Sequence, residues 1–303
     1  MNITKSILII PLAGLLLLTG CANHNGYKKL INDFQTASSV VTQSAGVYIT
    51  QLNKTQRDAY IDRQVNKGAE IKLNKVEEFQ VFSSKSIQAR LDALTQLASY
   101  GTLLGRLANS DTPQRITSNA EELKVSLDKL NEDVNTLTGN EDAKFKNALG
   151  PAALIMGEIA RFAVERKIQD SLNTAILKGE KPVTDLIDVL KHDLTQAYDL
   201  HSQAVQDSAV NYINGYHIEL KKKSSLDKLR KRGQEIKSAL DIREELPKGD
   251  PSYGLYAMGE AHKALVDYAK SPRNQDDLKN LAEQMEIFAE RAKRVGKVVQ
   301  QLQ

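Results

Sequence analysis

The sequence predicts an all-α protein, an elongated bundle of long helices that pair in coiled-coil-like hairpins. Aromatic residues make up only 5% of the 303 residues, glycine (17) and proline (7) are scarce, and charged residues make up 26%. A chain with few turn formers and many good helix formers favours long helices over sheets. Apolar residues also recur at steps of three and four along most of the chain, whereas no strand-like alternation of any length appears.

The first two predicted helices cover about 27–66 and 72–109. Apolar residues of the first lie at spacings compatible with one helical face: Tyr27, Ile31, Phe34, Val41, Tyr48, Leu52 and Ala59. The glycine of Asn66-Lys67-Gly68 predicts its end. The second has its clearest apolar stripe at Ile87, Leu91, Leu94 and Ala98. Polar residues from 109 onward then precede Pro113, a pattern typical of a helix end followed by a new start.

The third predicted helix, which begins near Pro113, has the cleanest pattern. Its apolar residues alternate steps of four and three over three full heptads, as in coiled coils and bundles: Ile116, Ala120, Leu123, Leu127, Leu130, Val134 and Leu137. The Thr138-Gly139-Asn140 stretch closes this helix. A fourth helix is predicted over about 141–178, with an interruption at Gly150-Pro151, and Gly179 is expected to cap its end.

A fifth helix is predicted to begin near Pro182 and to reach about 221. Leu226 then lies well off the apolar face that Leu220 belongs to, so we expect a bend or break at Lys221–Ser225. Ser224 with Asp227 offers a cap for the new helix.

The Pro- and Gly-containing loop at 246–251 is the strongest breaker after the N-terminal segment. A short helix over about 252–270 and a last helix over about 275–302 are predicted to follow it. The pattern is consistent with a long helical bundle at 27–246 and a C-terminal hairpin at 252–303 that packs on it or extends it. One continuous core is equally consistent.

Long helices with narrow apolar stripes cannot bury themselves singly and must run side by side. The stripes can pair within one chain or between chains, so self-association stays open.

The N-terminal residues 1–20 have the parts of a secretory signal peptide. Lys5 supplies positive charge, and an apolar stretch over 7–18 precedes small residues. That stretch is too short for a comfortable membrane-spanning helix, which needs roughly 20 apolar residues. Its end, Leu18-Thr19-Gly20-Cys21, resembles the lipobox of bacterial lipoproteins. The resemblance covers only residues 1–21.

In that family the cysteine sulfur receives a diacylglyceryl group, with acyl chains such as palmitate, and the signal is cut before the cysteine. The resemblance implies that Cys21 anchors the mature chain to a lipid bilayer of the bacterial cell envelope, with 21–26 as a short tether. Ala22 stands where Asp tends to retain such proteins at the inner membrane, which implies the outer membrane. The alternatives are an ordinary cleaved signal with an incidental Cys21, and a retained membrane anchor.

The composition argues against several classes of function. Cys21 is the only cysteine, so an internal disulfide is excluded. The net charge of +3 is too balanced to indicate nucleic-acid binding. No metal or cofactor site is predicted, because no two of the five histidines lie one helical turn apart. No phosphate-binding glycine loop and no Gly-x-Ser-x-Gly motif occurs. We therefore expect a protein that is not an enzyme, although catalytic groups can converge from distant helices.

Two stretches differ from this background. Residues 148–164 are the most apolar window of the mature chain, and we interpret them as a buried core helix, with insertion into a bilayer as the alternative. Residues 219–233 carry a basic cluster at an expected helix junction, suited to an anionic surface, although a solvated helix end is the commoner explanation of such clusters. The cluster consists of Lys221, Lys222, Lys223, Lys228, Arg230, Lys231 and Arg232.

These features predict a non-enzymatic envelope lipoprotein, a membrane-tethered helical scaffold or binding module for another envelope component, with another envelope protein as the expected partner. The alternative is a membrane-active, pore-forming-like helical protein that uses 148–164. An enzyme that acts on envelope polymers ranks third.

Overall fold

The structure is a computed structural model. It describes residues 18–78, 81–109, 113–135, 137, 143, 145–147, 149, 157–159, 161 and 168–301. Within these residues all the regular elements are helices, so the all-α prediction is confirmed. Their bounds are α1 Leu18–Lys67, α2 Leu73–Glu78, α3 Ser84–Ala108, α4 Pro113–Asn135, α6 Ile168–Lys221, α7 Leu226–Glu245, the 3₁₀ turn η1 Leu246–Gly249, α8 Pro251–Lys270 and α9 Gln275–Gln301.

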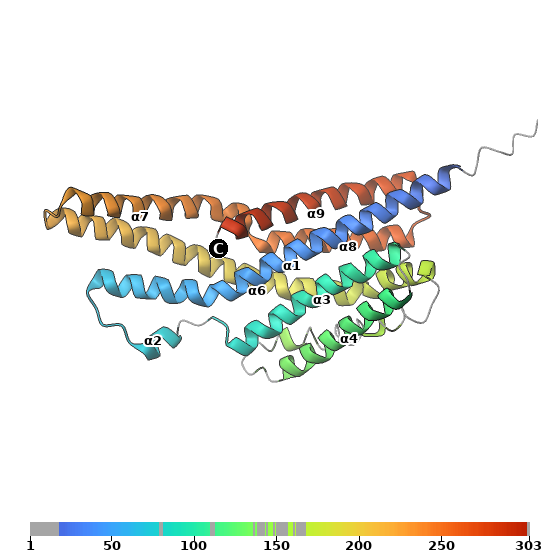
Figure 1. Ribbon diagram of the computed structural model, residues 1–303, viewed down its shortest axis with the longest axis horizontal. Coiled ribbons are helices and arrows are strands. Elements are labelled where there is room, and N and C mark those ends of the chain that lie inside the picture. Colours follow the sequence, from blue (N-terminus) through green and yellow to red (C-terminus); the bar gives the residue numbers. More distant parts are fainter. Residues whose placement is uncertain are drawn as a thin grey trace, which may run out of the picture.

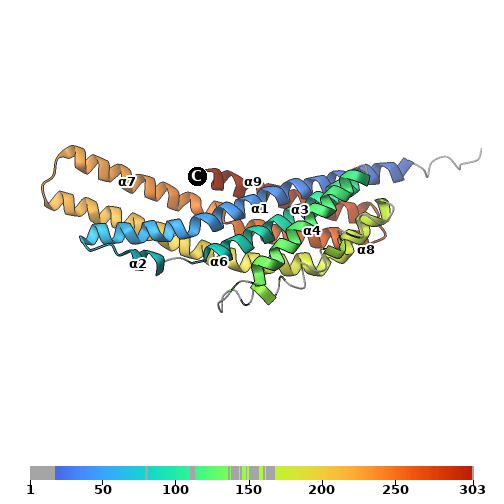
Figure 2. The same cartoon turned by 60° about the horizontal axis from the view of Figure 1, so that its bottom comes forward.

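Two very long helices give the molecule its elongated shape (Figure 1). Helix α1 has 50 residues and α6 has 54, which correspond to about 75 Å and about 80 Å at about 1.5 Å per residue. Helices α3, α4, α8 and α9 lie along the half that contains the start of α1, and we call this half the body. Helix α7 and the C-terminal ends of α1 and α6 form the other half, which we call the distal arm (Figures 1 and 2).

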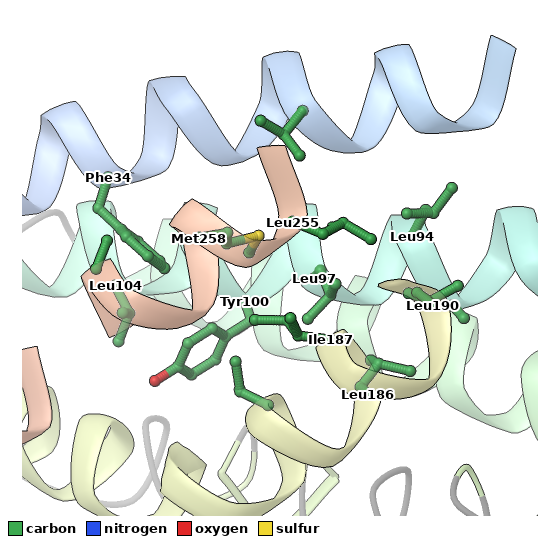
Figure 3. Packing of buried hydrophobic residues seen from close by; sticks show 14 of the residues in the cluster. Phe34, Leu94, Leu97, Tyr100, Leu104, Leu186, Ile187, Leu190, Leu255 and Met258 are labelled. Atoms are coloured by element: carbon green, nitrogen blue, oxygen red, sulfur yellow. The ribbon is translucent and has the colours of Figure 1, made fainter. Parts of the chain in front are cut away.

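One hydrophobic core joins the helices of the body. Figure 3 shows Phe34 of α1, Leu97 of α3, Ile187 of α6 and Met258 of α8 packed together. The stripe predicted for α4 is buried from Ala120 onward: Ala120, Leu123, Leu127, Leu130, Val134 and Leu137. Helices α8 and α9 contribute to the same core, so the C-terminal hairpin packs on the long helices as part of one continuous core.

The helix predicted over 72–109 is interrupted in the structure. Helix α2 ends at Glu78, and α3 begins at Ser84. The Asn53 side chain of α1 accepts hydrogen bonds from the backbone N–H groups of Val81 (2.9 Å) and Phe82 (3.2 Å) and donates one to the Phe82 carbonyl (2.7 Å). Ser83 then caps α3 by accepting from the Ser86 N–H. The side chain of Asn53 therefore stabilises the non-helical segment before α3, which the spacing of apolar residues does not predict.

The predicted helix end at Gly179 and the predicted start near Pro182 are wrong, because α6 continues through both residues. Gly179 lies against α3, where an added Cβ would come within 2.5 Å of the Tyr100 hydroxyl oxygen. Pro182 is buried inside the helix. Glycine and proline inside a helix cost about 1 and about 3 kcal/mol, and here close packing offsets that cost.

The predicted break between 221 and 225 is confirmed. Helix α6 ends at Lys221, Lys223 adopts a positive φ of 52°, and α7 begins at Leu226. The Ser224 hydroxyl donates a hydrogen bond to the Glu219 carboxylate (2.5 Å). The loop at 246–251 is reduced to η1, after which Asp250 caps α8 by accepting from the Ser252 N–H (2.8 Å).

Candidate interaction surfaces

The predicted lipidation site lies at one end of the molecule. Cys21 falls in the first turns of α1, so the predicted tether 21–26 is helical, and the Cys21 side chain lies outside the described residues. Tyr27 is the first buried side chain described, and its ring lies 4.7 Å from that of Tyr268. The six helical steps from Cys21 to Tyr27 correspond to about 9 Å, so the body begins close to the expected anchor.

The basic cluster lies at the opposite end of the molecule (Figure 1). Lys221 ends α6, Lys222 and Lys223 form the turn, and the other four cations occupy the first two turns of α7. The structure thus brings all seven residues to the end of the distal arm. Six of them are exposed, and Arg232 is half-buried. We call residues 218–232 the distal tip.

The acidic residues near the distal tip pair mainly with its two arginines. Arg230 lies 3.6 Å from Asp227, and Arg232 lies 2.9 Å from Glu235. The hydrogen bond from Ser224 and the neighbouring cations lower the pKa of Glu219.

For the five lysines of the cluster, by contrast, no ion pair occurs with any residue that the structure describes. Their charge is therefore presented to solvent.

Exposed apolar side chains accompany these lysines. Leu220 is 51% exposed, Leu226 is 61% exposed and Ile218 is 39% exposed. They remain uncovered because α7 packs mainly on α6 and buries only Ala239. Sequence reasoning found the charges but not this apolar component. The change of face at Leu226 was the only signal of it.

A groove between α6, α8 and α9 was missed by sequence reasoning. It has a volume of about 760 Å³, and Tyr198, Tyr253 and Tyr256 line it together with side chains of both charges. The Lys191 amine lies 5.7 Å from the centre of the Tyr256 ring. Burial raises the pKa of the Asp250 carboxyl, which also lines this groove. Exposed tyrosines on the polar face of α8 leave no periodic signal in the sequence. The groove offers aromatic faces and hydrogen-bonding groups.

Two buried polar pairs tie the helices of the body together. The Arg90 guanidinium lies 2.8 Å from the Asp193 carboxylate and 4.0 Å from the centre of the Phe82 ring. The Tyr100 hydroxyl lies 2.9 Å from the His262 ring nitrogen. These pairs link α3 to α6 and to α8, inside the core and away from both ends of the molecule.

The apolar segment 148–164 lies mostly outside the described residues. Of its described members, Leu149 and Ile159 are buried in the core, while Glu158 and Arg161 are exposed. Among the helices that the structure describes, none is both long and apolar enough to cross a bilayer. The described part of the chain also holds no group of three or more histidine, cysteine or acidic side chains arranged to bind a metal ion.

Comparison of the chain with protein-family models, with curated proteins and with solved structures found no match.

Proposed function

We propose that this chain is a non-enzymatic envelope lipoprotein, a helical rod anchored through Cys21 that holds its distal tip away from its own membrane to contact another envelope component. One observation carries the proposal: the residue expected to be acylated and the cationic tip lie at opposite ends of a single helical body (Figure 1).

The anchor is strong enough for this role. Each acyl methylene that enters a bilayer contributes about 0.8 kcal/mol, and a single chain holds a protein only marginally. The two or three chains that the lipobox implies at Cys21 would hold it essentially permanently. Ala22, next to it, favours the outer membrane.

Contacts between α1 and α6 connect the body to the distal arm. Helices α1 and α6 run side by side, and Gln56 of α1 donates a hydrogen bond to the Leu200 carbonyl of α6 (2.8 Å). Arg63 of α1 lies 3.4 Å from Asp207 of α6 farther along the arm. Because both helices also share the core of the body, the distal arm is continuous with the anchored end.

The alternative, a membrane-active protein that inserts 148–164, draws less support. Leu149 and Ile159 are buried against the other helices, so their insertion would require opening the core. This favours the interpretation of that segment as a core helix.

Site-specific crosslinking in native cells tests the proposal. A photo-crosslinking residue replaces Lys222 at the distal tip in one variant and Lys279 in the other. Lys279 is an exposed residue of α9 at the end near Cys21, because its neighbour Leu278 packs near Gly26. We expect an adduct from position 222 that position 279 does not give, and we expect Cys21→Ala to abolish it. Identical adducts from both positions, or an adduct that persists in Cys21→Ala, would contradict the proposal.

A further inference from the structure

The distal tip combines two kinds of exposed side chain on one convex turn. Five exposed lysines form no ion pair with any residue that the structure describes, although the nearby Glu219 carboxylate attracts two of them, Lys222 and Lys228. The five are Lys221, Lys222, Lys223, Lys228 and Lys231. Leu220 and Leu226 stand among them, 51% and 61% exposed. A solvated helix end would explain the lysines, but it does not explain two large apolar side chains uncovered at the same turn.

The distribution of charge also distinguishes between partners. A carboxylate-rich protein is best matched by arginine, whose planar group binds carboxylates in a bidentate manner. Here Arg232 is half-buried and lies 2.9 Å from Glu235, and Arg230 lies 3.6 Å from Asp227 in an exposed pair, so five of the seven cations are lysines outside any such pair. What remains are lysines, compact charges on flexible stems that suit a surface of diffuse negative charge.

The shape of the tip favours a flat partner. A stable protein interface takes roughly 20–30 residues from each side. The distal tip is smaller, since it consists of the end of α6, the turn and the first two turns of α7, and it projects beyond the body (Figures 1 and 2). Lipid headgroups can surround such a projection. Apolar side chains at an interface of this kind enter the boundary between headgroups and acyl chains.

We infer that the distal tip docks on the surface of an anionic lipid bilayer, with its lysines among the headgroups and Leu220 and Leu226 at the acyl boundary. This inference rests on the proposed function, because it names the component that the tip contacts. Since the anchor lies at the other end of the rod, the geometry points to a bilayer other than the one that holds Cys21.

Vesicle binding tests the inference on the unlipidated mature chain, residues 21–303 with Cys21→Ser, which retains the whole core from Tyr27 onward. We expect it to sediment with phosphatidylglycerol–phosphatidylcholine vesicles but not with phosphatidylcholine alone, and to be released by high salt. Each lysine near an anionic surface contributes roughly a fivefold factor in affinity. The triple variant Lys221→Gln, Lys222→Gln, Lys223→Gln should therefore bind about 100-fold more weakly.

The matched control removes the same charge elsewhere. Lys124, Lys279 and Lys293 are exposed lysines of the body, and their replacement by glutamine should leave vesicle affinity within about threefold of the parent. Equal losses in both triple variants would mean that net charge, not the tip, drives binding, and would overturn the inference.

Insertion of the leucines has its own readout, because the chain contains no tryptophan. Leu226→Trp introduces a single reporter at the tip, and Val125→Trp places one at an exposed apolar position of α4. We expect a blue shift of emission on addition of anionic vesicles for Leu226→Trp only. Absence of this shift would overturn the inference in favour of a purely ionic contact. Binding of soluble polyglutamate as tight as the binding of vesicles would overturn it in favour of an acidic protein partner. Neither result bears on whether Cys21 is acylated, so the two proposals can fail separately.

Discussion

At the scale of single residues, the core of the body is held by polar groups as well as by apolar packing. His262 is buried between helices, where its ring contacts the Tyr100 hydroxyl. Burial lowers the pKa of His262 to about 4, although Glu180 acts weakly in the opposite direction. Burial also lowers the pKa of His201 to about 4. Both histidines are therefore neutral in the folded protein at neutral pH.

These histidines predict that acid destabilises the protein. As the pH falls below about 6.5, these histidines become protonated in the unfolded chain, whereas in the folded chain they become protonated only near pH 4. Their contribution to the free energy of unfolding is therefore present above this pH range and is lost as the pH falls through it. For His262 the loss between about pH 7 and pH 5 is about 2 kcal/mol. Urea denaturation at both values should show a smaller loss for His262→Gln than for the parent, with His201 present in both. Equal losses would refute this account of His262.

At the scale of elements, the sequence predicts the helix ends that depend on nearby residues. It does not predict the helix ends that depend on contacts with distant parts of the chain. The break after Lys221 and the start of α8 at Pro251 follow from a change of apolar face and from a proline, and both are observed. The break before α3 depends on Asn53, almost thirty residues earlier in the chain. The glycine at position 179 does not end α6 but lies against Tyr100 of another helix, which leaves no room for a Cβ. Apolar periodicity contains no information on such distant partners.

Gly179 of α6 and Gly233 of α7 provide a matched test of that explanation. Gly179→Ala should lower the free energy of unfolding by about 2 kcal/mol, because the added Cβ would collide with the buried Tyr100 hydroxyl. Gly233→Ala in α7 should instead raise it by up to about 1 kcal/mol, since no atom lies within 4 Å of the added Cβ. Urea denaturation of both variants measures the difference. A stabilising Gly179→Ala would show that the glycine is not required by this contact.

The residues of the basic cluster could be predicted from the sequence, but their place in the fold and their exposed apolar neighbours could not. Seven cations at a helix junction are visible in the sequence. Their isolation at the end of a two-helix projection, with Leu220 and Leu226 uncovered beside them, follows from how α6 and α7 pack. The tyrosine groove was invisible for a similar reason, because three helices form it together.

At the scale of the whole molecule, the lengths of α1 and α6 set the distance between the two ends. The anchor expected at Cys21 and the distal tip are separated by most of the length of the rod (Figure 1). A bundle of shorter helices with the same core composition would place both near one membrane. The proposed role therefore depends on long α1 and α6 helices as much as on any side chain.

The proposed envelope role requires that Cys21 be acylated, and the mass of the protein extracted from its native membranes measures this modification. We expect a chain that begins at Cys21 and carries a diacylglyceryl group. A chain that retains Met1, or that bears a free thiol at position 21, would contradict it.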